Sequence, residues 1–148
     1  MTPRALDWRS VERKLIRMRR LIEQLVALGP FDARRFTDEP IAGLAVERLL
    51  TLLVELAFGV NSHVAVAVVG QAPDSYRESF LLAAEAGVID RDLAGALAPS
   101  AGLRNVLVHA YLDVDHVRVA EAAAVAPGLF GEYVRQVAGW FADRPDAG

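Results

Sequence analysis

A short segment in the last third of the chain carries four residues that could act together on a phosphodiester. Arg104, Asn105, His109 and Tyr111 lie within eight positions of one another, and the other residues of the segment are apolar. A guanidinium is always charged and can bind a phosphate through two parallel hydrogen bonds, whereas an imidazole titrates near neutral pH. RNA cleavage without a metal needs a base for the 2′-hydroxyl, an acid for the leaving 5′-oxygen and positive charge beside the phosphorane. We therefore expect His109 to transfer protons, Arg104 to bind the phosphate and Asn105 to orient either one.

On an ideal helix these polar residues share one face with apolar ones. Tyr111 falls about 20° from Arg104 and His109 about 140° from it, so Arg104 and His109 are not direct neighbours on one straight helix. Val108 and Leu112 fall on the same face, which suits a subunit contact better than open water. A two-fold axis beside this face would bring a second His to the site, because a symmetric dimer buries the same patch twice. The plainer alternative is an ordinary helix with a surface Arg and a hydrogen-bonded His. The opposite face is wholly apolar and consists of Leu103, Val106, Leu107 and Ala110.

The segment resembles the signature of the HEPN superfamily, in which an Arg and a polar residue are followed, at a spacing of four to six residues, by a His. More narrowly, it resembles the HepT-like toxin family, whose pattern is Arg, four residues, His, one residue, Tyr. Other segments look like family segments in the same order along the chain: residues 47–50, His63, residues 73–80 and residues 86–89. The resemblance covers roughly residues 10 to 140 and is specific because the order is kept.

The resemblance implies an all-α fold: a HEPN-like bundle of antiparallel long helices plus short helices that forms a homodimer. It implies a metal-independent endoribonuclease toxin of a type VII (HepT/MntA) toxin–antitoxin system, with RNA as substrate and no cofactor. Arg104 and His109 of both subunits would face a cleft near the two-fold axis. The partner would be an MntA-like minimal nucleotidyltransferase that transfers AMP from ATP to the motif tyrosine, here Tyr111. AMP there would add bulk and negative charge beside Arg104 and so inhibit the nuclease.

One position departs from the family pattern. The long helix of HepT-like proteins often carries an Asp four residues before its His, and here Gly59 stands at that place. A second function therefore stays open, that of a catalytically silent helical HEPN subunit that binds and presents substrate to a nucleotidyltransferase partner. Retention of Arg104, Asn105, His109 and Tyr111 together favours the enzyme.

Length and composition agree with a cytoplasmic helical protein. A chain of 148 residues is long enough for one domain with a real core and short for two, so we expect a single domain over residues 1–148. Hydrophobic residues make up 53% of the chain, and the mean hydropathy is +0.26. Cys is absent, which excludes disulfides and thiolate metal sites. The acidic and His residues of positions 109–116 match no zinc pattern, so no metal site is expected.

Two features bear on membranes and nucleic acids. Residues 56–73 contain no Asp, Glu, Lys or Arg, but polar residues and glycines interrupt the stretch, so we expect a buried core helix and no membrane. The net charge is −3, yet residues 1–35 hold nine Lys and Arg against four Asp and Glu. This basic segment either binds an RNA backbone or is a solvated helix face, and no DNA partner is expected. Most of its cations are Arg9, Arg13, Lys14, Arg17, Arg19 and Arg20.

The hydrophobic periodicity predicts helices almost everywhere. We expect helices over about 7–28, 40–69 and 75–87, and from Asp90 through the motif, with a kink or restart at Pro99. Residues 113–115 read as a turn that leads to a short helix over 116–124, with a separate last helix after Pro127. His63 is expected to be a buried, hydrogen-bonded structural residue. Residues 144–148 are expected to form a frayed tail.

Overall fold

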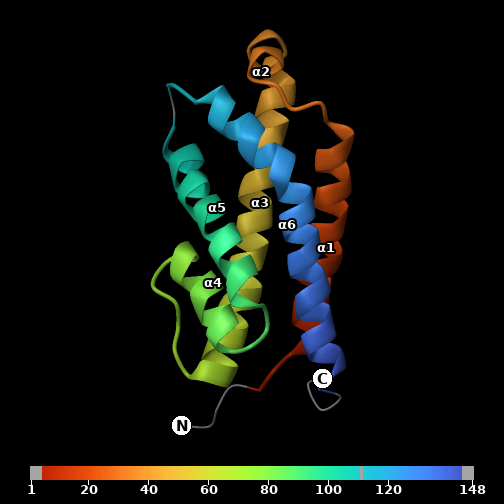
Figure 1. Cartoon of the computed structure of the whole chain (residues 1–148), viewed down its shortest axis with the longest axis vertical. Helices are drawn as coiled ribbons and strands as arrows, with labels where there is room; N and C mark the ends of the chain where they lie inside the picture. The colour runs from red at the N-terminus through yellow and green to blue at the C-terminus, as the bar shows by residue number, and fades with distance from the viewer. Residues whose placement is uncertain (1–4, 111, 145–148) are drawn as a thin grey trace.

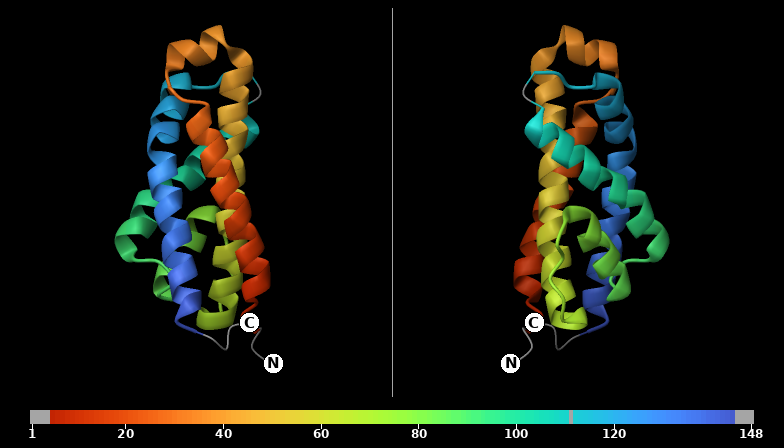
Figure 2. Two further views of the ribbon diagram at one scale, coloured as in Figure 1. Left: turned by 90° about the vertical axis from the view of Figure 1, so that its right-hand side faces the viewer. Right: turned by 90° about the vertical axis from the view of Figure 1, so that its left-hand side faces the viewer.

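The computed structural model describes residues 5–110 and 112–144, and this part of the chain is helical with no β-strand. Three long helices, α1 (Trp8–Ala27), α3 (Pro40–Val64) and α6 (His116–Ala142), run side by side with α1 antiparallel to the other two (Figure 1). The shorter α4 (Tyr76–Glu85) and α5 (Arg91–His109) cover α3 on the side away from α1, and α2 (Ala33–Asp38) closes one end of the bundle (Figure 2). The expected all-α bundle is confirmed.

The core is built from the apolar faces that the periodicity predicts. On α1 one face is buried, and it consists of Val11, Leu15, Met18, Leu21 and Leu25. Helix α3 is apolar on more than one side because it contacts α1, α4, α5 and α6, and it continues into a π-helical turn, η1 (Ala65–Val69). The stretch Pro40–Val69 is long and apolar enough to cross a membrane by length and composition alone. Complete burial of Val46, Leu53 and Val60 in the bundle accounts for much of this apolar character.

Side-chain caps fix where the helices begin. The carboxylate of Asp90 accepts the backbone N–H of Leu93 at the start of α5, and the Ser75 hydroxyl accepts the N–H of Glu78 at the start of α4. The Glu78 carboxylate accepts from the N–H of Asp74 rather than from that of Ser75, so only half of a capping box is formed. Gly70 ends the long helix with a φ of 79°, a left-handed conformation in which a side chain would be strained.

One expectation about the helices is wrong, because α6 continues through Pro127 as one element and no separate helix begins after it. Helix α5 also runs through Pro99 without a restart, which was one of the two outcomes expected at that proline. A proline removes one backbone hydrogen bond and strains the preceding turn. Ala126 and Phe130 are both buried on the face that α6 presents to the core, so packing on either side of Pro127 outweighs that cost.

One short helix was not expected from the sequence. Helix α2 begins after Asp32, whose carboxylate accepts the N–H groups of Arg34 and Arg35, and it buries the Phe36 side chain against the bundle. An Asp followed by an apolar residue four positions later is a usable signal for such a helix.

The C-terminal tail that was expected over residues 144–148 lies almost wholly outside the described residues, which end at Arg144.

His63 has the structural role that was expected, although it is half-buried rather than buried. Its Nε2 atom accepts a hydrogen bond of 2.8 Å from the backbone N–H of Asp7, the residue that caps α1. The contact joins the start of α1 to the far end of α3, 56 positions apart in the chain. His63 therefore helps to set the position of α1 against α3.

Candidate active site

The guanidinium of Arg104 lies where α3, α4 and α5 meet. Its Nη2 atom is 3.4 Å from Oε1 of Glu55 on α3, and its Cζ atom is 4.3 Å from the centre of the Tyr76 ring on α4. The Nη1 atom donates to Oδ1 of the neighbouring Asn105 at 3.3 Å. The Arg104 side chain is only 18% exposed, so these three contacts hold a mostly covered cation in one place.

The edge of the Arg104 guanidinium that suits a phosphate is short of acceptors. Its Nε atom is buried and has no hydrogen-bond partner within the described residues, and its Nη2 contact with Glu55 is long for a charged hydrogen bond. A buried donor without an acceptor is unusual and costs free energy. Nε and Nη2 together form one fork of the guanidinium, which matches two oxygens of one phosphate. Because Nε is covered, a phosphate would reach both atoms only after the side chains over Nε move.

Glu55 and Tyr76 are site residues that the sequence analysis missed. A signal exists for Glu55, because it is the single acidic residue between positions 48 and 73 and so stands alone in an apolar helix. It is separated from Arg104 by 49 positions, and no local pattern connects the two. Tyr76 belongs to one of the family-like segments, but its contact with Arg104 depends on how α4 lies against α5.

A buried network of hydrogen bonds holds the backbone of Tyr76 in place. The backbone carbonyl of Tyr76 accepts from the Ser79 hydroxyl at 2.6 Å, and that hydroxyl accepts from Nδ2 of Asn61 at 3.1 Å. The Tyr133 hydroxyl donates to Oδ1 of Asn61 at 2.6 Å. Burial raises the pKa of Tyr133, so its phenol stays a donor. The network ties α3, α4 and α6 together beneath the ring on which Arg104 rests.

Asn105 and His109 lie on the exposed side of α5. Both side chains are exposed, and His109 forms no hydrogen bond or ion pair within the described part of the chain. The structure thus brings Arg104 and Asn105 together and leaves His109 apart, as their angular separation on the helix predicts. Val108 is also exposed, in agreement with its expected place on the polar face. Val106, which belongs to the opposite, apolar face, is 44% exposed.

The expected position of Tyr111 on the motif helix lies outside the described residues. Helix α5 ends at His109, and Ala110 has φ −88° and ψ 85°, outside the helical region. The expected offset of about 20° between Arg104 and Tyr111 assumes a helix that continues past residue 109.

At position 59, where glycine stands in place of the Asp of the family pattern, the side chain of Lys14 lies close to the backbone. A Cβ atom built on Gly59 would lie 2.9 Å from Cε of Lys14, which crosses from α1 over this part of α3. The Lys14 ammonium donates to the Ser10 hydroxyl at 3.1 Å. Any side chain at position 59 would require Lys14 to move, so glycine at this position and the path of the lysine side chain depend on each other.

Two further features bear on ligand binding. A mostly apolar pocket of about 360 Å³ lies between α3, α5 and α6, and Arg104 contributes to its wall, whereas Glu55 and His109 do not. Among the described residues no three His, Asp or Glu side chains gather as a metal site would require. His116 instead lies with its Nδ1 atom 3.0 Å from the Thr37 hydroxyl, and Asp115 caps α6.

Comparison with known proteins connects these residues to a family. Residues 12–136 match the family described as "Ribonuclease HepT-like". The tRNA nuclease HepT of Aphanizomenon flos-aquae is 35% identical over 94 residues, which are 64% of this chain and 64% of that protein.

Two solved structures share the fold. The tri-AMPylated HEPN toxin of Shewanella oneidensis, in complex with MNT antitoxin, is similar with a TM-score of 0.77 at 22% identity, over 88% of this chain and 97% of that one. YutE, a cytosolic protein from Bacillus subtilis, is similar with a TM-score of 0.81 at 16% identity, over 95% and 94% of the two chains.

Proposed function

Because this chain belongs to the HepT-like ribonuclease family, we propose that it is a metal-independent endoribonuclease and the toxin of a type VII toxin–antitoxin pair. The observation that carries the proposal is the placement of Arg104. Its guanidinium is held between the Tyr76 ring and Glu55, with the Nε and Nη2 edge short of acceptors. The exposed imidazole of His109 lies about one and a half helical turns away on α5.

The reaction that these groups suit is attack of the RNA 2′-oxygen on the adjacent phosphorus. His109 accepts the 2′-hydroxyl proton as the new P–O bond forms, and Arg104 neutralises the charge that develops on the phosphorane oxygens. The bond to the 5′-oxygen then breaks, and this oxygen leaves with a proton from a second acid. The products are a 2′,3′-cyclic phosphate and a 5′-hydroxyl. Asn105 orients the guanidinium through its contact with Nη1.

A homodimer supplies the second acid in this proposal. One chain offers a single His on the exposed side of α5, and the mechanism needs one group that accepts a proton and another that donates one. Val106 and Val108 are exposed beside His109, and Leu112, just beyond the helix, is 95% exposed. Burial of such side chains favours association, and a two-fold axis here would bring the imidazoles of two chains to one cleft.

The proposed partner is a minimal nucleotidyltransferase of the MntA type, acting in the cytoplasm. The solved HEPN toxin of Shewanella oneidensis carries AMP groups and is bound to MNT antitoxin, and its fold is that of this chain. We extend this relationship to the present protein with Tyr111 as the AMP acceptor. The relative from Aphanizomenon flos-aquae is a tRNA nuclease, which makes tRNA the first substrate to test.

A catalytically silent subunit that presents substrate to a nucleotidyltransferase is the second candidate. The observation that favours it is the internal carboxylate: Glu55 already neutralises Arg104 in part, and Gly59 replaces an acidic residue common in the family. A silent subunit would still bind RNA or the transferase, but the purified chain would not break phosphodiester bonds.

Cleavage of tRNA by the purified chain in the presence of EDTA separates the two candidates. We expect 2′,3′-cyclic phosphate ends, and a loss of at least ~100-fold in rate for His109→Ala, the lower range for general acid–base catalysis. His116→Ala is the matched control, because His116 contacts Thr37 at the other end of the bundle from α4 and is expected to leave the rate unchanged. Full activity of the His109 variant, or 3′-hydroxyl products, would contradict the assignment.

A further inference from the structure

Helix α1 carries a concentration of positive charge that the described fold does not neutralise. Five arginines and one lysine lie between positions 9 and 20, while the whole chain has a net charge of −3. All five arginines are exposed, and none forms an ion pair with any carboxylate of the described residues, whose four ion pairs lie on other helices. Packing in the core does not require these charges, because α1 buries only its apolar face.

The α1 cations are arranged along one side of the helix. Arg9, Arg13, Arg17 and Arg20 fall within an arc of about 80°, roughly one per turn over about 16 Å. Glu12 and Glu23, the two acidic residues of α1, fall outside this arc. No large exposed hydrophobic residue lies within the arc. A row of guanidinium groups with one charge per turn fits a regular chain of phosphates, whereas a protein partner usually requires an apolar centre in its interface.

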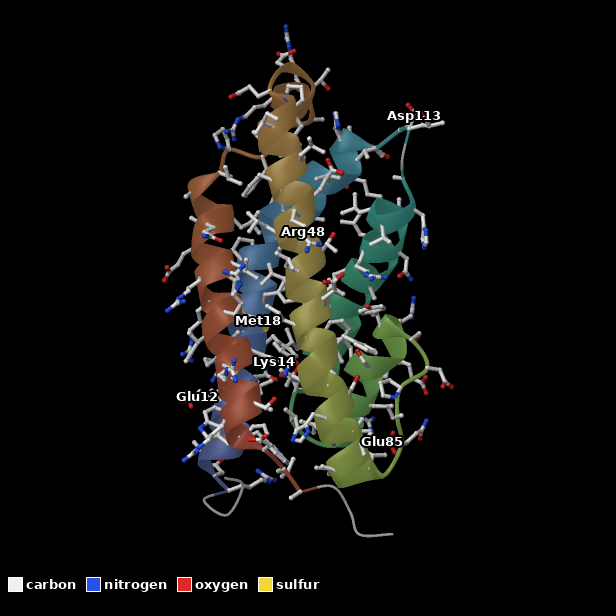
Figure 3. All side chains as sticks on the ribbon, turned by 180° about the vertical axis from the view of Figure 1, so that it is seen from behind. Glu12, Lys14, Met18, Arg48, Glu85 and Asp113 are labelled. Atoms are coloured by element: carbon white, nitrogen blue, oxygen red, sulfur yellow. The ribbon has the colours of Figure 1, made fainter. Side chains whose placement is uncertain are left out.

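The row borders a groove between α1 and α3. A hollow of about 340 Å³ is lined by Arg13, Arg17 and Lys14 together with Ser10 and Leu56. Lys14 crosses this groove over Gly59, where a side chain would displace it. Figure 3 shows Lys14 extending from α1 toward α3. The groove is therefore open, and three cationic side chains line it.

The groove and the candidate active site lie on neighbouring parts of α3. Leu56 lines the groove, and the residue before it is Glu55, which contacts Arg104. Arg48 is exposed on α3, about 20° from Glu55 around the helix and two turns away, and it forms no ion pair within the described residues. It projects on the same side of the bundle as Lys14 (Figure 3). Unpaired cations thus extend from α1 across α3 toward Arg104.

We propose that Arg13, Lys14, Arg17 and Arg48 form a track that binds the RNA backbone beside the cleavage site. This inference rests on the proposed ribonuclease function and adds to it the surface that holds the substrate away from the scissile bond. Arg104 contacts the reacting phosphate, whereas the track contacts phosphates of other nucleotides. Its contribution is electrostatic, independent of base sequence and sensitive to salt.

The test measures RNA binding by the full chain in a His109→Ala background, so that no substrate is consumed. Fluorescence anisotropy with a labelled single-stranded RNA and with tRNA is recorded between 50 and 200 mM salt. We expect the Arg13→Gln/Arg17→Gln double variant to lower the slope of log K against log salt by about 1.4 on the single strand, or about 0.7 for each lost phosphate contact. Arg34→Gln/Arg91→Gln is the matched control, because both residues are exposed on other helices and the net charge changes equally.

Three outcomes decide the inference. A lower slope for the α1 variant alone supports it, and in the active chain the same variant should raise KM more than it lowers kcat. Equal slopes for both double variants overturn the track. The track is also overturned if the α1 variant keeps its RNA affinity and instead no longer binds the antitoxin. If the unmodified chain cleaves RNA in that case, the proposed function stands without the track. If the chain neither binds nor cleaves RNA, the proposed function itself is wrong.

Discussion

The Cζ atom of Arg104 lies 4.3 Å from the centre of the Tyr76 ring, and this contact joins α5 to the first turn of α4. Tyr76 also packs against Phe58 of α3, with ring centres 4.4 Å apart. The ring is thus held by the core on one side and supports the guanidinium on the other. A cation over an aromatic face keeps its charge available to a phosphate while its direction is fixed.

Removal of the Tyr76 ring is therefore expected to weaken catalysis without unfolding the protein. A cation–π contact contributes about 0.5 to 2 kcal/mol, depending on how far it is desolvated, which corresponds to a loss of about 2-fold to 30-fold in kcat/KM for Tyr76→Leu. Tyr76→Phe keeps the ring and should retain most of the activity. Steady-state kinetics on RNA measure the difference, and equal losses for both variants would assign the effect to the hydroxyl instead.

Neutralising Glu55 is expected to tighten RNA binding. The carboxylate is about one-third exposed and competes with phosphate for Nη2 of Arg104. Because a partly exposed ion pair contributes about 0.2 to 1 kcal/mol, Glu55→Gln should raise RNA affinity by up to about 5-fold. Glu78→Gln is a control on α4, where the carboxylate caps the local backbone away from the guanidinium. Fluorescence anisotropy in the His109→Ala background measures the RNA affinity of each variant. Weaker binding by Glu55→Gln would mean that Glu55 orients Arg104 for the phosphate.

The parts of the fold that depend on local chemistry could be predicted from the sequence. The spacing of Val11, Leu15 and Met18 predicts the buried face of α1, and Asp90 predicts where α5 begins, because caps and amphipathic periodicity act within a few residues. Pro127 shows the limit of local rules. It is a helix breaker by propensity, and it lies inside α6 because buried neighbours on the same face pack against other helices.

The candidate site was predictable only in part, for a related reason. Arg104, Asn105 and His109 share one helix, and their separation around it follows from helical geometry alone. The contact with Glu55 depends on the crossing of α3 and α5, which joins positions far apart in the chain. No short-range pattern encodes that crossing.

The buried phenol of Tyr133 is expected to stabilise the fold through its bond to Asn61. Tyr133→Phe leaves the Oδ1 atom of Asn61 buried without this donor, which should lower the free energy of unfolding by about 1 to 3 kcal/mol. Urea unfolding followed by circular dichroism measures the loss. No change would show that the amide finds another donor.

Because the Tyr133 phenol is buried, we expect the free energy of unfolding to depend on pH in the alkaline range. Burial raises the pKa of Tyr133, whereas in the unfolded chain the phenol ionises at a pKa of about 10. Above that pH the unfolded state releases a proton that the native state keeps, so the contribution is complete below about pH 10 and falls as the pH rises further. The unfolding free energy of the unmodified chain should therefore decrease more steeply above pH 10 than that of Tyr133→Phe.

A charge at position 108 is expected to prevent dimerisation. Val108 is exposed beside His109, and an Asp there would be buried without a partner in the proposed interface. Val108→Asp should give folded monomers that do not cleave RNA, as measured by analytical ultracentrifugation and a nuclease assay. Val26→Asp is the matched control, because Val26 is exposed on α1 and should leave both properties unchanged. An active monomer of the unmodified chain would remove the need for a second His.

The last prediction concerns which tyrosine accepts AMP. The chain has three tyrosines; Tyr133 is buried, which leaves Tyr76, whose ring lies against Arg104, and Tyr111, which matches the family motif. Co-expression with the cognate nucleotidyltransferase should add ~329 Da per AMP to Tyr111, and the added negative charge near α5 should silence the nuclease by competing with RNA phosphate. Tyr111→Phe should stay active and unmodified, because it lacks the acceptor oxygen, whereas Tyr76→Phe should still be modified. Intact-mass spectrometry with peptide mapping shows whether Tyr111 or Tyr76 carries the AMP. AMP on Tyr76, or silencing of Tyr111→Phe by added AMP, would place the control of Arg104 on α4 rather than in the segment that follows α5.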